Sequence, residues 1–193
     1  MSPWFAKAAV LAAAVGVVLI RMPHMRRNRR IRVARSRTGP RETVRARLSQ
    51  IAFAVPLIWI ATPLFAFADY RLQPWVFAAG ILCLAASLTL FYRSHADLAE
   101  GFSSELEVRE QHRLVTGGVY GRVRHPMYLA FLLLAVSGVL VIPNWVAGPS
   151  YLILWVAVLA LRIGPEEQMM IEEFGPEYEA YVRRTKRLIP GIW

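Results

Sequence analysis

Apolar residues in this chain are gathered into five runs that polar segments separate. A helix that crosses the hydrocarbon core of a bilayer needs roughly 17–25 apolar residues, so four runs are long enough and the fourth in order falls just short. None has the polar face that a helix in a soluble core shows. The pattern predicts an all-α integral membrane protein with five transmembrane helices. In chain order the runs are Trp4–Ile20, Leu48–Ala68, Trp75–Tyr92, Met127–Ile142 and Trp145–Leu161.

The segments around the last run predict two further features. Only Pro143-Asn144 separates the last two runs, which indicates a tight helical hairpin. After the fifth run, Gly164-Pro165 is expected to end the membrane helix, and Pro165 to begin a new one. Apolar and aromatic residues then recur at helical spacing, which predicts a C-terminal amphipathic helix on the cytoplasmic face. These residues are Met170, Phe174, Tyr178, Tyr181 and Val182.

Basic residues predict the orientation of the spans. The chain carries a net charge of +10, and 21 of its 23 Lys and Arg residues fall in segments 21–47, 93–126 and 162–193. By the positive-inside rule these segments are cytoplasmic and the N-terminus lies outside. The first run has its charges after the apolar stretch, which is the wrong order for a cleaved signal peptide, so we expect a retained anchor helix.

Segment 21–47 contains 11 arginines. Basic clusters of this kind bind either nucleic acid or anionic lipid headgroups. No aromatic residue alternates with these arginines to provide a stacking surface for bases. We therefore expect contact with anionic headgroups and no nucleic-acid binding. The 193 residues form a single membrane domain, with three spans in residues 1–93 and a catalytic half in residues 94–193.

Residues 93–126 form a long polar insert that is expected to be functional, because a loop of this length without periodicity is usually functional or disordered. Its last part, Gly118–Tyr128, carries Arg124-His125-Pro126 and runs directly into an apolar helix. Pro126 suits the first turn of that helix, and the remaining first-turn N–H groups can receive a carboxylate. His125 is either a cap or a functional group, since an imidazole at a membrane boundary needs a partner.

Three charged residues follow the last apolar run. Glu166 and Glu167 are either stabilised by a helix dipole or bind the ammonium or ribose of a cofactor. Arg162 either extends to the interface or holds an anionic group of a lipid substrate. Arg162 and Glu166 share a helix face only if the helix continues through Gly164-Pro165. The basic and apolar tail, residues 183–193, either reaches lipid headgroups or folds back over the pocket.

The segment Gly118–Tyr128, with Arg162 followed by Glu166-Glu167, resembles the isoprenylcysteine carboxyl methyltransferase family and its phospholipid-methylating relatives. The resemblance implies a membrane enzyme that uses S-adenosylmethionine and takes its substrate from the bilayer. It implies a catalytic role for Arg162 and Glu166. It also implies a cofactor pocket formed by His112, Leu114, Val115, Gly118, Tyr120, Arg124, His125, Pro126, Met127, Tyr128, Glu166 and Glu167.

Other readings stay open at this level. Membrane sterol reductases that bind NADPH carry the same Arg-His-Pro-x-Tyr motif, although they have more spans. A non-enzymatic scaffold or a transporter subunit is a further alternative. The methyl acceptor is most consistent with an isoprenylcysteine-like carboxylate, but an isoprenoid acid, a small thiol and a phospholipid amine are also possible. The histidines show no metal-ligand spacing, so no metal is expected.

Overall fold

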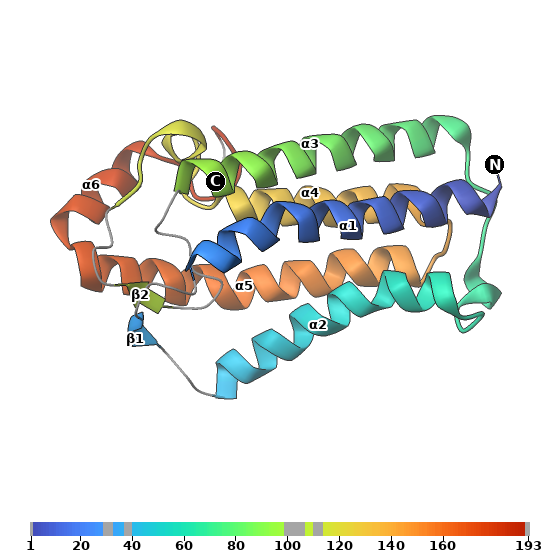
Figure 1. Cartoon of the computed structure of the whole chain (residues 1–193), viewed down its shortest axis with the longest axis horizontal. Coiled ribbons are helices and arrows are strands. Elements are labelled where there is room, and N and C mark those ends of the chain that lie inside the picture. The colour runs from blue at the N-terminus through green and yellow to red at the C-terminus, as the bar shows by residue number, and fades with distance from the viewer. Residues whose placement is uncertain (1, 29–32, 37–39, 99–106, 110–113, 192–193) are drawn as a thin grey trace.

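The computed structural model describes residues 2–28, 33–36, 40–98, 107–109 and 114–191. Among the described residues, five long helices run alternately up and down one long axis, and α1 begins at the end of this bundle that is remote from α6 (Figure 1). The short helix α6 (Pro176–Arg184) and the 3-10 turns η1 (Ala66–Ala68) and η3 (Gly118–Gly121) lie at the ends. The long helices are α1 (Pro3–Asn28), α2 (Pro40–Ala61), α3 (Pro74–Leu98), α4 (Pro126–Val141) and α5 (Ala147–Phe174).

Four of these helices, all but α4, are long and apolar enough to cross a membrane. Helix α4 is apolar but has only 16 residues. Large apolar side chains point outward from the bundle; Leu82 of α3 is 73% exposed and Ile153 of α5 is 67% exposed. Such positions are favourable only where the surrounding solvent is itself apolar. The chain is an integral, multi-pass membrane protein.

A small antiparallel sheet departs from the all-α prediction. Strand β1 (Val33–Ser36) pairs with β2 (Glu107–Arg109), with Val33 opposite Arg109. The two strands have four and three residues, which is too short to show the alternation that predicts a strand. Their pairing brings the segment after α1 next to the segment after α3.

The prediction that Gly164-Pro165 ends the membrane helix is wrong. Helix α5 runs through Pro165 without interruption and ends at Phe174, where Gly175 takes a φ of +50°. A proline removes one helical hydrogen bond, and this loss is tolerated where the following turns are held by other contacts. Here the turn after Pro165 is held by ion pairs and by the buried side chain of Met169. The shorter helix α6 buries Tyr178 and Tyr181 on one face.

Small residues bring α3 and α4 into close contact. Ser87 Oγ donates to the carbonyl of Ala130 (2.8 Å), and Ser137 Oγ donates to the carbonyl of Gly80 (3.0 Å). A Cβ atom at Gly80 would lie 2.6 Å from Val141, so only glycine fits there. Close backbone approach through small residues is how helices associate in lipid, where apolar side chains gain little from burial.

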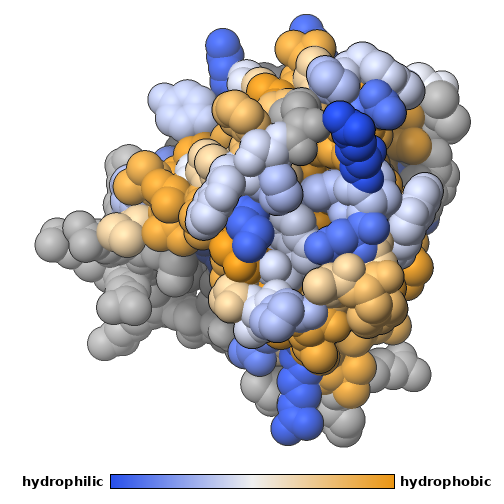
Figure 2. Space-filling model, turned by 90° about the vertical axis from the view of Figure 1, so that its right-hand side faces the viewer, coloured by the Kyte–Doolittle hydropathy of each residue, from blue (hydrophilic) through white to orange (hydrophobic). Residues whose placement is uncertain are grey.

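The end of the bundle where α1 begins is closed by a polar cluster. Asn144 donates to Asp69 Oδ1 (2.6 Å), and Asn144 Oδ1 accepts from the N–H groups of Val146 (3.0 Å) and Ala147 (2.7 Å) at the start of α5. Trp59 Nε1 also donates to Asp69 (3.2 Å). Polar and apolar residues are mixed over this end of the molecule (Figure 2). Helix α5 is therefore fixed at the end remote from the site described next.

Candidate functional site at the opposite end of the bundle

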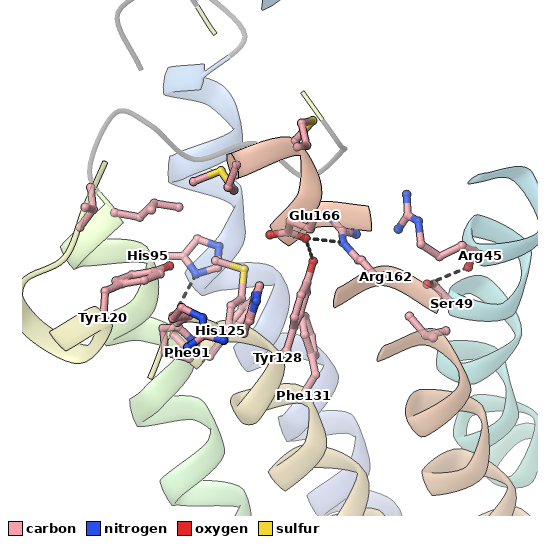
Figure 3. Close-up of a pocket in the computed structure, with 18 of the residues that line it drawn as sticks. Arg45, Ser49, Phe91, His95, Tyr120, His125, Tyr128, Phe131, Arg162 and Glu166 are labelled. Carbon is pink, nitrogen blue, oxygen red and sulfur yellow. Dashed lines mark hydrogen bonds and ion pairs between the residues drawn. The ribbon is translucent and has the colours of Figure 1, made fainter. Parts of the chain in front are cut away.

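A cavity of about 370 Å³ lies at the end of the bundle where α1, α3 and α5 finish. Helices α1 to α6 and the segment 114–128 all contribute side chains to its wall. Figure 3 shows Tyr120, His125 and Tyr128 on one side of this space, and Arg162 and Glu166 above them. This volume is within the range of roughly 300–1,000 Å³ that is usual for small-molecule and cofactor sites.

The motif loop, which comprises Gly118–Arg122 and precedes the Arg124-His125-Pro126 motif, is held on α3 by the carboxylate of Asp97. Gly118 has a φ of +58°, a conformation that side chains other than glycine rarely adopt. Asp97 Oδ2 accepts a hydrogen bond from the N–H of Val119 (2.7 Å). A Cβ atom at Gly118 would lie 2.1 Å from that oxygen, so the close approach itself requires glycine. The sequence offered no signal for Asp97, which lies in a different helix.

Tyr120 is buried at the next turn of this loop. Its hydroxyl donates to the carbonyl of Ser94 in α3 (3.3 Å), and its own carbonyl accepts from the hydroxyl of Tyr181 in α6 (2.6 Å). Burial raises the pKa of Tyr181 to about 12, so its hydroxyl stays protonated and continues to donate near neutral pH. The two tyrosines join α3, the motif loop and α6 along one wall of the cavity.

The C-terminal tail folds back onto the motif. The N–H of Arg124 donates to the carbonyl of Lys186 (2.8 Å), and the N–H of His125 donates to the carbonyl of Arg187 (3.0 Å). Val123 forms a parallel β-bridge with Lys186. Of the two alternatives for the tail, the described part supports the one in which it folds back, because Lys186 and Arg187 pair with the residues that precede α4.

Glu167 is a buried carboxylate at the centre of a basic cluster. Its Oε1 accepts from Arg124 Nε (2.9 Å) and lies 3.2 Å from His125 Nε2, while its Oε2 lies 2.6 Å from a guanidinium nitrogen of Arg187. Arg124 also donates to the carbonyls of Val182 and Thr185. Glu167 thus ties the motif, α5 and the tail together from behind the cavity wall.

Glu166 is the neighbouring carboxylate and lies on the cavity side (Figure 3). The hydroxyl of Tyr128 donates to Glu166 Oε2, and Arg162 Nε donates to the same oxygen (3.2 Å). The guanidinium of Arg162 lies over the ring of Tyr128, 5.4 Å from its centroid. The ring of His125 stacks on the ring of Tyr128, with centroids 5.3 Å apart and an angle of 10° between the ring planes. These four side chains form one contiguous polar surface.

Most of the site residues that the sequence predicted meet at this cavity. Within the described residues, Gly118 and Glu167 lie behind the wall rather than in it. His112 falls outside the described residues. Those that line the cavity are Leu114, Val115, Tyr120, Arg124, His125, Pro126, Met127, Tyr128, Arg162 and Glu166.

The sequence reading missed several residues from the first three helices that also line the cavity. Arg21 and Arg45 belong to the segment 21–47, for which the sequence predicts only lipid contact, yet both line the cavity and Arg45 is 7% exposed. His95 is fully buried, and its Nδ1 lies 2.9 Å from the carbonyl of Phe91. The described residues contain no cluster of His, Cys, Asp or Glu that could hold a metal ion.

The fold and this cavity define a class: a multi-pass helical membrane protein with a polar ligand-sized cavity at one end of its bundle. The model of the isoprenylcysteine carboxyl methyltransferase family matches residues 78–172, which include most of the cavity wall. Over this segment, which is just under half of its length, the chain is similar to the family.

Curated relatives agree with this assignment. A protein-S-isoprenylcysteine O-methyltransferase of Schizosaccharomyces pombe is 34% identical over 133 residues, covering 66% of this chain and 52% of the relative. A probable protein-S-isoprenylcysteine O-methyltransferase of Oryza sativa subsp. indica is 35% identical over 88 residues, covering 45% and 46%. The human protein-S-isoprenylcysteine O-methyltransferase is 28% identical over 120 residues, covering 61% and 42%. The chain thus matches about half the length of these relatives.

A solved structure shares the fold. The eukaryotic intramembrane Ras methyltransferase, isoprenylcysteine carboxyl methyltransferase, superposes with a TM-score of 0.56 at 23% identity. The match covers 81% of this chain and 54% of the solved chain. The arrangement of membrane helices described above is therefore the arrangement of a known membrane fold.

Proposed function

We propose that this chain is an S-adenosylmethionine-dependent membrane methyltransferase that acts on the carboxylate of a lipophilic, isoprenylcysteine-like acceptor. The observation that carries the proposal is the polar surface of Arg162, Glu166, Tyr128 and His125 on the cavity wall. This surface contains residues of both segments that carry the family likeness: the segment Gly118–Tyr128, and Arg162 with Glu166. The curated relatives are named for O-methylation of isoprenylcysteine and the matching family for carboxyl methylation of it, which supports this choice of acceptor.

The residues present fit such a cofactor. The cavity has the volume of a cofactor site and combines a half-buried carboxylate, Glu166, with aromatic and aliphatic surfaces. Glu166 would hold the ammonium or a ribose hydroxyl, and the first turn of α4, with Met127 in the wall, would receive the amino-acid carboxylate. When bound, S-adenosylmethionine supplies a methyl group on a sulfonium, and transfer to a carboxylate oxygen gives a methyl ester and S-adenosylhomocysteine.

The protein's own part in this reaction is to bind and orient. A carboxylate acceptor is already ionised near neutral pH, so no strong base is required. Arg162 would hold the acceptor carboxylate, and Glu166 and Tyr128 fix the position of Arg162. Orientation of two reactants in a site that excludes water lowers a barrier by about 7–11 kcal/mol in favourable systems.

The membrane topology is part of the proposal. The chain forms a single domain in which α1 to α5 all span the bilayer, and the cavity end faces the cytoplasm. The high content of basic residues in segments 21–47, 93–126 and 162–193 supports this orientation. The Arg-rich segment would contact anionic headgroups. Single cysteines placed at Arg71 and Arg184 and labelled from each side of sealed vesicles would test the orientation, because the two residues should react from opposite sides.

Calorimetry on detergent-purified protein tests the activity. We expect S-adenosylmethionine to bind with micromolar affinity, and Glu166→Gln to weaken this binding at least tenfold. Glu173→Gln is the matched control, because Glu173 lies on the same helix and is exposed. Binding of NADPH in place of S-adenosylmethionine would favour a reductase. Binding of neither would favour a non-enzymatic role.

A further inference from the structure

Three exposed tryptophans lie at the end of the bundle that is remote from the cavity. Trp4 lies in the first turn of α1, Trp75 lies in the first turn of α3, and Trp145 lies just before α5; each is between 70% and 75% exposed. The three helix ends share one end of the molecule (Figure 1). Phe67 of η1 lies at the same end and is 82% exposed. None of these four side chains lines the cavity of the candidate site, so the site does not account for them.

The surface that adjoins these aromatic rings is the apolar flank of the bundle. Leu82 lies two turns after Trp75 on α3, Ile153 lies at a similar depth on α5, and both are exposed. Hydrophobic and hydrophilic residues are mixed over the end itself (Figure 2). The tryptophans therefore lie where an apolar, lipid-contacting surface changes to a mixed one. An indole is favourable at such a boundary, because its ring is apolar and its N–H needs an acceptor.

Lys7 is a second observation that places the membrane boundary at this level. It is the one basic residue in the first apolar run, and it lies one turn after Trp4. Its Nζ donates to the carbonyl of Ile60 near the end of α2 (3.1 Å) and lies 5.6 Å and 5.9 Å from the ring centroids of Trp4 and Trp59. An ammonium group is costly in hydrocarbon, and a lysine near a helix end extends toward the interface. The boundary of the hydrocarbon therefore lies close to Trp4.

The opposite boundary follows from the same three helices. At a fixed interval of 17 residues after each tryptophan, the chain has a residue type that is typical of a membrane interface. These residues are Arg21 after Trp4, Tyr92 after Trp75 and Arg162 after Trp145. An interval of this length corresponds to about 26 Å of helix, close to the hydrocarbon thickness of roughly 30 Å. Two of the three, Arg21 and Arg162, line the cavity of the candidate site.

We propose that Trp4, Phe67, Trp75 and Trp145 form an anchoring belt that binds the interfacial region of the phospholipids in the leaflet opposite the candidate site. Their partner is the layer of ester and glycerol groups, and the belt sets the depth of the bundle in the bilayer. Because helices of fixed length join the belt to the cavity, the belt also holds the cavity at the other interface. The inference does not depend on the proposed function, and its tests need no cofactor or methyl acceptor.

Depth-dependent quenching of fluorescence locates the belt. The protein is reconstituted into phosphatidylcholine vesicles that carry bromine atoms either near the glycerol end or near the methyl end of one acyl chain. The signal of the belt is the difference between the wild type and a triple variant with Trp4→Phe, Trp75→Phe and Trp145→Phe. We expect the shallow bromines to quench this signal more strongly than the deep ones, so that the triple variant loses most of the shallow quenching. Stronger quenching by the deep bromines, or quenching by neither, would overturn the proposal.

One added tryptophan calibrates the depth. Leu82→Trp, made in the triple variant, places an exposed indole two turns from the belt on α3. We expect the deep bromines to quench this indole more strongly than the shallow ones. The same depth profile for Leu82→Trp and for the belt would contradict a position of the belt at the interface.

The anchoring role has a separate test, in which the melting temperature is measured in vesicles of increasing acyl-chain length. Replacing Trp4, Trp75 and Trp145 together by Leu extends the apolar surface past the boundary, so the chain length of highest stability should shift to longer chains. Replacing them by Gln shortens that surface and should shift the optimum to shorter chains. Ile153→Leu, within the span, is the control and should leave the optimum unchanged. An optimum that moves in neither triple variant would overturn the anchoring role.

Discussion

Arg162 and Glu166 lie one turn apart on the same face of α5, and Arg162 Nε donates to Glu166 Oε2 across 3.2 Å although Pro165 stands between them. The pair exists only because the helix continues through the proline. The continuous helix places both charged side chains in the wall of the cavity. The continuity of α5 is therefore a condition for the polar surface of the site.

Replacing Tyr128 by Phe isolates the contribution of one hydroxyl. The ring contacts with His125 and Arg162 are kept, and only the hydrogen bond to Glu166 is lost. A hydrogen bond to a charged group contributes about 1.5–3 kcal/mol. We expect S-adenosylmethionine affinity or turnover to fall at least tenfold in Tyr128→Phe. Tyr92→Phe, at a side chain that is 55% exposed, should behave as the wild type.

Glu167→Gln should lower the stability of the protein, because Glu167 lies behind the cavity wall and is paired with three basic groups. The change leaves three buried or half-buried basic groups around a neutral amide. Removing one partner of a buried ion pair costs about 3–5 kcal/mol, so a clear fall in the melting temperature is expected in detergent. The same change at exposed Glu173 should leave that temperature unchanged. Equal melting temperatures for the two variants would show that the cluster contributes little to folding.

Gly118→Ala should disrupt the motif loop. The positive φ of Gly118 is unfavourable for alanine, and the new Cβ would overlap the carboxylate of Asp97. We expect a loss of at least about 1 kcal/mol in unfolding free energy, together with weaker cofactor binding. The adjacent Gly117→Ala is the control, because no heavy atom lies within 4 Å of its added Cβ. Similar behaviour of the two variants would contradict the strain argument.

Truncation tests the tail. A chain that ends at Arg184 lacks the carbonyls that accept from Arg124 and His125, and it lacks the guanidinium of Arg187. We expect it to lose S-adenosylmethionine binding in calorimetry while retaining the helical circular dichroism signal of the bundle. A chain that ends at Gly191 keeps all three contacts and should bind normally. Normal binding by the shorter chain would mean that the tail does not support the cavity.

The sequence predicted the parts of this molecule that depend on local pattern. Apolar runs predicted the positions of the long helices because a helix in lipid must be apolar over its whole length. The motif residues Tyr120, His125 and Tyr128, and the pair Arg162 and Glu166, line one cavity. Their chemical roles stay predictions until a ligand is bound.

The features that the sequence reading missed depend on contacts between distant segments. Neither β1 nor β2 has a pattern of its own, and their pairing is visible only in three dimensions. Asp97 and Arg21 lie in α3 and α1, and no sequence pattern distinguishes them from the residues beside them. Their positions at the site are visible only when the bundle is assembled. The error at Pro165 has another origin: a rule about local backbone chemistry was outweighed by the side-chain contacts of the following turn.

The bridge between Val123 and Lys186 also has a consequence for biosynthesis. A ribosome makes a chain from its N-terminus, so every helix precedes the tail residues that complete the segment before α4. Insertion of the bundle into the bilayer can therefore begin well before the cavity is finished. The nascent protein is a membrane protein first, and the capacity to bind a ligand comes only when Lys186 and Arg187 have been added.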